Sequence, residues 1–421
     1  MGGGQGRHLP GEKCKKRCRR LGLEVEFGRS GFFGNNRIFV NMKLYKWSGA
    51  GNLFVIIDGR NPGQNDSAGN GGNECAMDSP EQSGFYRNPD VIRQLCRDFG
   101  TDGLMILGDG REPSEGNGRE PSKACSRELP GATACRAGDR AALTDFSMEF
   151  YNPDGSSGMM CGNGGRCIAA FADYLGIVPA SGTDTFVFDA PDGLHTAEIQ
   201  SRPSFTESPG SGKEHSQAPC WTVRLGMKDT EGITEYPDGL FLNTGTRHFV
   251  KFVPDVDALD IEKEALPIRH DPRFAPEGTN VNFVEVRLRT GMPSADGTNR
   301  GISTGEGSSS PVEIRIRTFE KGVEGETAAC GTGITAAALA CCYKGIAPNG
   351  GTVATPDGST AASPNVSSAA TPKGTAATPD GGASRSGYSI QAREATLEVD
   401  FLRNGKDSFS EIFLTGPAAL L

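Results

Sequence analysis

The sequence predicts an α+β protein of two similar halves, each with strands wrapped around a central helix, and a cleft between the halves. Two segments, Cys161-Gly162-Asn163-Gly164 and Cys330-Gly331-Thr332-Gly333, repeat one pattern in which a cysteine and a Gly-rich turn precede an apolar helix. Neither helix has a polar face, and a helix that is apolar all round is buried all round. Short segments typical of strands surround each helix in a similar rhythm.

The first half contains two predicted helices. Asn88 is a suitable N-cap and Gly100 a suitable stop for a helix over 89–99, whose apolar residues recur at helical spacing. The central helix of this half is predicted over 165–175, after the turn that begins at Cys161. Strands are predicted at 43–47, 53–57, 104–107, 146–151, 185–188 and 195–200.

The second half repeats this arrangement. Its central helix is predicted over 334–343, after the turn that begins at Cys330. Strands are predicted at 221–225, 240–243, 249–253, 281–289, 312–319, 394–402 and 411–414.

Polar blocks rich in Gly, Ser and Pro interrupt both halves. Such composition cannot bury enough apolar area to offset its ordering entropy, so these blocks are predicted to be surface insertions. The predicted organisation is a disordered extension at 1–41, a first domain at 42–204 with insertions at about 59–84 and 109–141, and a second domain at 219–410 with insertions at about 291–311 and 349–387.

Charge and composition exclude several classes of protein. A formal net charge of -9 argues against nucleic acid as a partner, and no apolar run is long enough to span a membrane. Twelve cysteines in 421 residues are too few for a disulfide scaffold, which favours a reducing, cytoplasmic location. The expected partner is a small molecule, and the choice between monomer and homodimer stays open.

The two cysteine turns suit proton exchange at a carbon acid. A helix N-terminus offers unpaired N–H groups and partial positive charge, which lower the pKa of a thiol and hold a carboxylate. If Cys161 and Cys330 face one substrate across the cleft, a thiolate can remove an α-proton while the opposite thiol returns one, which inverts the centre. No pyridoxal lysine or metal cluster is evident, so neither a cofactor nor a metal is expected.

Several motifs resemble those of diaminopimelate epimerases, in the same order along the chain. They are Ser48-Gly-Ala-Gly-Asn52, Tyr151-Asn-Pro-Asp-Gly155, Met160-Cys-Gly-Asn-Gly-Gly-Arg-Cys167, Gly278-Thr-Asn280, Phe319-Glu-Lys-Gly322 and Glu326-Thr-Ala-Ala-Cys-Gly-Thr-Gly333. The resemblance covers residues 42–343 and implies interconversion of LL- and meso-2,6-diaminopimelate, on the route to lysine and peptidoglycan. It also implies two pseudo-symmetric domains, each a curved, barrel-like mixed sheet wrapped around a central helix, with the C-terminal strand 411–421 joining the first domain.

The resemblance also implies roles for individual residues. Cys161 and Cys330 would be the acid/base pair, and His248 and Arg247 would support them. The implied substrate-binding residues are Asn52, Asn152, Gly162, Asn163, Thr246, Asn280, Glu320, Lys321, Gly331 and Thr332.

This chain departs from the family pattern at several positions, among them a shortened segment at 99–103. Leu53 replaces the usual Asp, Thr246 an Asn, and Lys321 an Arg. We hypothesise that Arg247 takes over part of the grip on the distal end of the substrate.

Three alternatives stay open. One is a proline or hydroxyproline racemase of the same fold, a family that tends to carry His where this chain has Asn163. Another is a catalytically impaired relative. The third is a redox or scaffold protein in which Cys161 and Cys330 form a disulfide.

Overall fold

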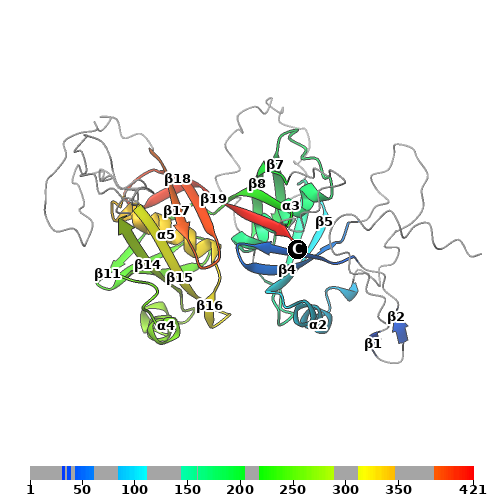
Figure 1. Cartoon of the computed structure of the whole chain (residues 1–421), viewed down its shortest axis with the longest axis horizontal. Helices are drawn as coiled ribbons and strands as arrows, with labels where there is room; N and C mark the ends of the chain where they lie inside the picture. The colour runs from blue at the N-terminus through cyan, green and yellow to red at the C-terminus, as the bar shows by residue number, and fades with distance from the viewer. Residues whose placement is uncertain are drawn as a thin grey trace, which may run out of the picture.

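The fold consists of two lobes that share one long strand (Figure 1). A computed structural model of the chain describes residues 31–33, 36–38, 43–60, 84–110, 144–158, 160–203, 218–288, 312–346 and 384–421. In this part of the chain, no helix is long and apolar enough to cross a membrane.

The first lobe is a closed ring of strands. Its elements are β3 (Tyr45–Gly49), β4 (Asn52–Asp58), α2 (Pro89–Phe99), β5 (Gly103–Asp109), β6 (Phe146–Tyr151), α3 (Gly162–Tyr174), β7 (Thr185–Ala190), β8 (Gly193–Ser201) and β9 (Cys220–Gly226). Each strand pairs with the next, and the C-terminal end of β19 (Ser408–Leu420) closes the ring by pairing with both β9 and β3.

The second lobe has the same connectivity. Its elements are β10 (Thr230–Glu231), β11 (Thr234–Tyr236), β12 (Gly239–Asn243), β13 (Arg247–Phe252), α4 (Ile261–Arg269), the 3-10 turn η2 (Pro272–Phe274), β14 (Asn280–Leu288), β15 (Val312–Glu320), β16 (Gly325–Thr327), α5 (Gly331–Tyr343), β17 (Ser384–Gln391), β18 (Thr396–Arg403) and β19. Parallel strands β4 and β5 are linked through α2 as β13 and β14 are through α4, and α3 and α5 occupy equivalent crossovers. The predicted fold class is confirmed.

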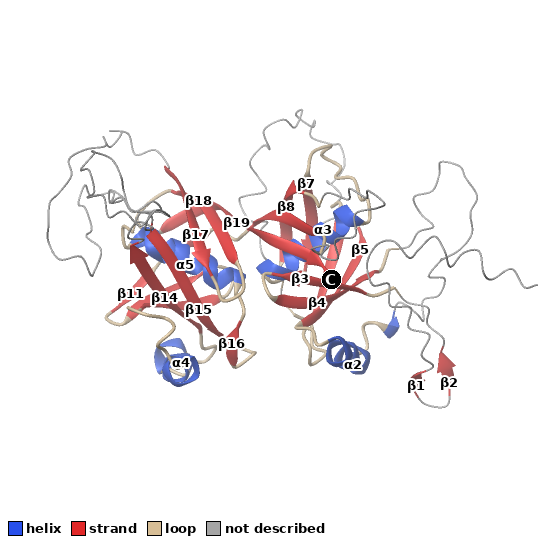
Figure 2. Cartoon of the chain, in the orientation of Figure 1, coloured by secondary structure: helices blue, strands red, loops and turns tan. Residues whose placement is uncertain are grey.

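The two central helices form the core of their lobes (Figure 2). In α3, every residue from Gly162 to Ala172 is buried, and α5 is buried from Gly333 to Cys342. Their apolar surfaces pack against the inner faces of the surrounding strands, as expected for helices without a polar face. By contrast, α2 and α4 lie on the same outer side of the two lobes (Figure 1).

The lobes share a strand at their junction. β19 pairs with β18 and β10 in the second lobe, and then with β9 and β3 in the first. The predicted boundary at residue 219 is therefore misplaced, because β9 is a strand of the first lobe and the chain enters the second lobe only after it. Sequence patterns show that β9 is a strand, but they carry no information about its non-local partners.

Two other boundaries differ from the predictions. The insertion predicted at 349–387 ends earlier, because Ser384 already pairs with Arg403 as the first residue of β17. Within the extension expected to be disordered, 31–33 and 36–38 pair as the hairpin β1 (Gly31–Phe33) and β2 (Asn36–Ile38). Most of the remaining predicted insertion residues lie outside the described part of the chain.

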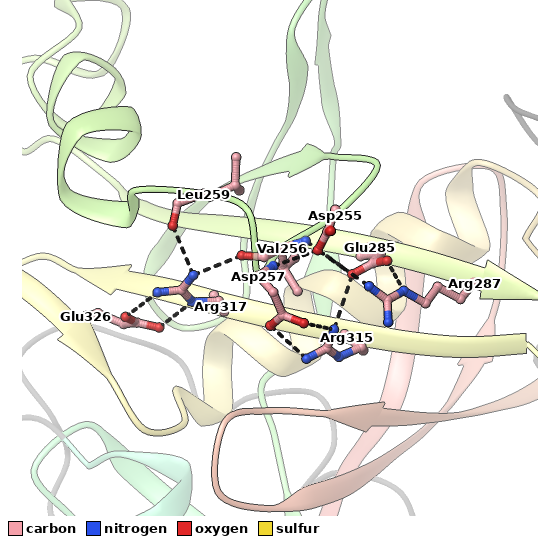
Figure 3. A network of polar contacts seen from close by, with 9 residues as sticks. All are labelled: Asp255, Val256, Asp257, Leu259, Glu285, Arg287, Arg315, Arg317 and Glu326. Atoms are coloured by element: carbon pink, nitrogen blue, oxygen red, sulfur yellow. Dashed lines mark hydrogen bonds and ion pairs between the residues drawn. The ribbon is translucent and has the colours of Figure 1, made fainter.

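An ionic network fastens the outer layer of the second lobe to its sheet (Figure 3). On β15, Arg317 donates to the carbonyls of Val256 and Leu259 at 2.9 and 3.1 Å and forms a two-pronged pair with Glu326 at 2.7 Å. The adjacent Arg315 pairs with Asp257 in the same way. This network fixes the β15–β16 hairpin, which carries residues that reach the junction of the lobes.

Candidate active site

The N-termini of α3 and α5 meet at the junction of the lobes. A Cβ atom added at Gly331 would lie 3.0 Å from the Cα of Gly162, and one added at Gly162 would lie 3.3 Å from the Cα of Gly331. Cys161 and Cys330 are the N-cap residues of these helices, in extended backbone conformation. Both helices therefore begin three residues earlier than predicted, and their first turns are the Gly-rich segments themselves.

Cys161 lies at the open end of α3. Its Sγ accepts a hydrogen bond from the backbone N–H of Gly164 at 3.2 Å, and the residue is partly exposed. Burial of the sulfur raises the pKa of this thiol to about 11, while the N–H of Gly164 and the cation of Arg166 act in the opposite direction. The expected lowering of the thiol pKa by the helix N-terminus is therefore wrong for Cys161 as a whole. The helix does lower this pKa, but desolvation of the sulfur raises it by more.

Cys330 lies beside a carboxylate, that of Glu320. The residue is buried, and burial followed by the charge of Glu320 raises the pKa of its thiol well above the usual value. Burial also raises the pKa of Glu320, against hydrogen bonds from Thr327 and Cys330. Thr327, next to the anchored Glu326, donates to Glu320 Oε1 at 2.5 Å. The ionic network behind β15 thus helps to orient Glu320 toward Cys330.

A buried histidine reaches Cys330 through hydroxyl groups. His248 Nε2 lies 2.9 Å from the hydroxyls of both Thr246 and Thr332, and Thr332 Oγ1 lies 3.5 Å from Cys330 Sγ. His248 Nδ1 lies 3.0 Å from Asn282 Nδ2, which also donates to the carbonyl of Phe249.

The orientation of Asn282 determines the tautomer of His248. Because Thr318 donates to Asn282 Oδ1 at 3.0 Å, the amide nitrogen faces the ring and makes Nδ1 an acceptor. The imidazole proton is then on Nε2 and is donated to the threonine hydroxyls. The hydroxyl of Thr332, having accepted this bond, is free to donate to Cys330.

We expect His248 to make folding acid-sensitive. The side chain is fully buried, and burial lowers its pKa from 6.5 to about 3. Between these values the unfolded chain binds one proton that the folded chain does not, so the free energy of unfolding falls as pH falls, by about 1.4 kcal/mol per pH unit at most. In urea titrations at pH 7, 6 and 5, His248→Gln should flatten this dependence by up to one proton. A slope equal to that of the wild type would contradict the assignment.

Asn163 connects the two lobes. Its side-chain amide donates to Asn52 Oδ1 at 2.5 Å, in the first lobe, and to the carbonyl of Ala329 at 2.7 Å, in the second. Asn52 in turn donates to Asp102, whose carboxylate also accepts the backbone N–H of Leu53. The residue just before Cys330 is thus tied to the first turn of α3.

Asn280 connects two loops of the second lobe. Its amide donates to the carbonyl of Arg247 at 3.0 Å, and its Oδ1 accepts the backbone N–H of Lys321 at 2.8 Å. These contacts hold the start of β13 against the end of β15, where Glu320 lies.

Two of the predicted site residues are not brought to the cysteines. The guanidinium of Arg247 pairs with Glu277 and lies 5.2 Å from the ring centroid of Phe241, on the face of β13 opposite His248. The side-chain amide of Asn152 donates to Ser156 in the loop after β6. The geometry therefore gives no support to the hypothesis that Arg247 grips the substrate.

Sequence reasoning missed four polar residues of this region: Arg166, Asn282, Thr327 and Asp102. Asn282 follows Asn280 by two residues and therefore shares its face of β14, a signal that the alternation of the strand contains. Arg166 gives no such signal, because it lies in a helix that the sequence pattern indicates to be apolar. In the structure its side chain is completely buried with the apolar residues of that helix.

Two matching barrels, whose cysteine-capped central helices abut at their N-termini, define a two-lobed protein with its candidate site at the junction of the lobes. A family model described as "Diaminopimelate epimerase" matches residues 240–367. A diaminopimelate epimerase from Flavobacterium psychrophilum is 32% identical over 302 residues, which cover 71% of this chain and 81% of that protein. One from Chlorobaculum tepidum is 31% identical over 303 residues, covering 69% and 80%. The chain belongs to the diaminopimelate epimerase family.

Solved structures with a similar arrangement include a probable proline racemase from Agrobacterium radiobacter. It has 14% sequence identity and a TM-score of 0.41, with 90% of each chain covered. A hydroxyproline epimerase from Agrobacterium vitis has 12% identity and a TM-score of 0.40, covering 90% of this chain and 92% of that one.

Proposed function

We propose that this chain interconverts LL- and meso-2,6-diaminopimelate without a cofactor, with Cys161 and Cys330 as the two acid/base groups. The observation that carries the proposal is the contact between Gly162 and Gly331, because it brings two cysteine-capped helix N-termini to one point. One thiolate removes the α-proton while the opposite thiol delivers another, so the centre inverts. The reaction would serve lysine and peptidoglycan synthesis, in a cytoplasm that keeps both thiols reduced.

The helix N-termini supply the stabilisation that the carbanion requires. Backbone N–H groups of the first turns, at Gly162, Asn163, Gly331 and Thr332, lack partners within their own helices. They are suited to bind the α-carboxylate and to stabilise the charge that develops on it as the proton leaves. In this role they act on the transition state more strongly than on the substrate.

Substrate binding would complete the activation of the base. The protein's own groups leave both thiols largely protonated at neutral pH, because burial raises their pKa values. The α-ammonium of an amino acid placed between them adds a positive charge that favours the thiolate. Glu320, a half-buried carboxylate beside Cys330, is suited to receive that ammonium group.

The test is an exchange assay on the purified chain with a reductant in D2O. LL-diaminopimelate should yield the meso form with one deuterium at the inverted α-carbon, and proline and hydroxyproline should exchange no α-proton. Exchange with proline but not with diaminopimelate would move the chain to the racemase alternative. A folded, reduced chain that exchanges neither would overturn the proposal in favour of an impaired relative.

A further inference from the structure

Arg166 is a completely buried cation whose hydrogen-bond partners among the described residues include no carboxylate. Its Nη1 donates to the carbonyl of Gly162 at 3.1 Å and its Nη2 to Asn163 Oδ1 at 2.7 Å, while Nε has no hydrogen-bond partner in the part of the chain that the structure describes. Burying a guanidinium without an opposite charge is strongly unfavourable. A cation kept in such a place indicates a nearby group that carries negative charge at some stage.

The helix geometry directs this cation to the cysteine turn. Side chains on an α-helix lean toward its N-terminus, so a residue three and four positions after Asn163 and Gly162 lies over the first turn. Gly416 of β19 leaves room for the guanidinium, since a Cβ atom there would lie 3.3 Å from Nε. Arg166 therefore lies between the first turn of α3 and β19, the strand that the two lobes share.

The ionisable groups around Arg166 are Cys161 and Cys167. Burial lowers the pKa of Arg166 to about 10, and both sulfurs oppose this change. Cys167 is fully buried in the core of the first lobe, whereas Cys161 is partly exposed at the junction. Cys161 also faces Glu320 of β15, which disfavours its thiolate, and it couples to Cys330 at the N-cap of α5. Arg166 is the cation that acts on Cys161 against these effects.

Arg166 also reaches the second cysteine through Asn163. Because the guanidinium binds Asn163 Oδ1, the amide nitrogen must point away from it, toward Asn52 and the carbonyl of Ala329. Ala329 precedes Cys330. One side chain thus fixes a contact that joins the two cysteine turns across the junction.

We propose that Arg166 is a positioning residue for both cysteines: its charge stabilises the thiolate of Cys161, and its planar fork orients the Asn163 amide that holds Ala329 beside Cys330. The proposal deepens the proposed function, on which its catalytic meaning rests. Lysine would preserve the charge but not the fork, and methionine would preserve neither.

The experiment measures the thiolate of Cys161 directly. Alkylation of the full chain by iodoacetamide is followed at Cys161 by peptide mass spectrometry across a pH series, in the absence of substrate. In Arg166→Met the apparent pKa of Cys161 should rise by about one unit or more, because the thiolate loses its neighbouring positive charge. A rise of one unit lowers the thiolate equilibrium tenfold. In Arg166→Lys the alkylation profile should stay close to that of the wild type, while turnover falls because the Asn163 contact is lost.

The matched control is Arg403→Met. Arg403 is also buried, donates to the backbone carbonyls of Gly405 and Lys406, and interacts with the thiol of Cys342 at the C-terminal end of α5. Its loss should therefore leave the Cys161 profile unchanged. An Arg166→Met profile that superimposes on the wild type would overturn the proposal. If that variant does not fold, Arg166→Lys decides: a wild-type profile with reduced turnover supports the proposal, and an upward shift or full turnover overturns it. Because alkylation requires no substrate, the Cys161 profiles of both variants are independent of whether diaminopimelate is the substrate. Only the turnover of Arg166→Lys rests on the proposed function.

Discussion

Replacing either Cys161 or Cys330 with alanine is expected to abolish inversion while the fold persists. Acid/base groups of this kind contribute about 10²–10⁴-fold each, so epimerisation should fall by at least that factor. Both cysteines are N-cap residues at the junction and not members of the helical cores, so thermal melting should change little. Progress is measured as formation of the meso isomer from LL-diaminopimelate under reducing conditions.

The exchange catalysed by the one cysteine left in each variant tests the assignment of one base to each face. A variant with one thiol can remove and return a proton only on its own face, so it should exchange the α-proton of one stereoisomer without inverting it. Cys161→Ala and Cys330→Ala should therefore show opposite stereoisomer preferences in solvent exchange. Equal exchange of both isomers by one variant would contradict the assignment of one base to each face.

Two other cysteines are matched controls. Cys167 lies in α3 and Cys341 in α5, both with 0% exposure, and neither lies at a helix N-terminus. Alanine at these positions should preserve most of the activity. The controls separate loss of an acid/base group from a general response to loss of a thiol.

Local signals explain why part of the fold could be predicted. The bounds predicted for α2 agree with the structure because the determinants are adjacent in the chain: Asn88 accepts the N–H of Asp90, and Gly100 adopts the left-handed conformation. The starts of α3 and α5 were missed because cysteine is not a usual N-cap and glycine is a poor helix former. The prediction also missed α4, whose apolar pattern is interrupted by Pro267.

The site was predictable to the extent that it repeats along the chain. The duplicated cysteine turns and the two apolar helices lead to one conclusion because each signal lies within a few residues. The hydrogen bonds around them do not: Asn163 meets Ala329 across 166 positions, and His248 meets Thr332 across 84. Thiol pKa values also could not be derived from helix position alone, because they depend on burial by both lobes.

We expect alanine at Gly331 or at Gly162 to reduce kcat/KM strongly without unfolding the protein. The Cβ atom of Gly331→Ala would lie 3.0 Å from the Cα of Gly162, which is backbone and can give way only if the helices separate. Displacing reacting groups by about 1 Å can lower the rate about 10²-fold. Stability is expected to be nearly unchanged, because alanine favours a helix by up to about 1 kcal/mol over glycine and offsets part of the strain.

Gly165→Ala is the control for this effect, since it adds a Cβ atom to α3 three residues after Gly162, away from the contact between the helices. A Cβ atom there would meet only side-chain atoms, those of Leu225 at 2.9 Å and Met160 at 3.0 Å, which can rotate aside. The measurement pairs steady-state kinetics with thermal melting for all three variants. If Gly331→Ala matched Gly165→Ala in kcat/KM, the spacing between the two helix N-termini would not limit the reaction, and the requirement that both cysteines act at one centre would lose its structural basis.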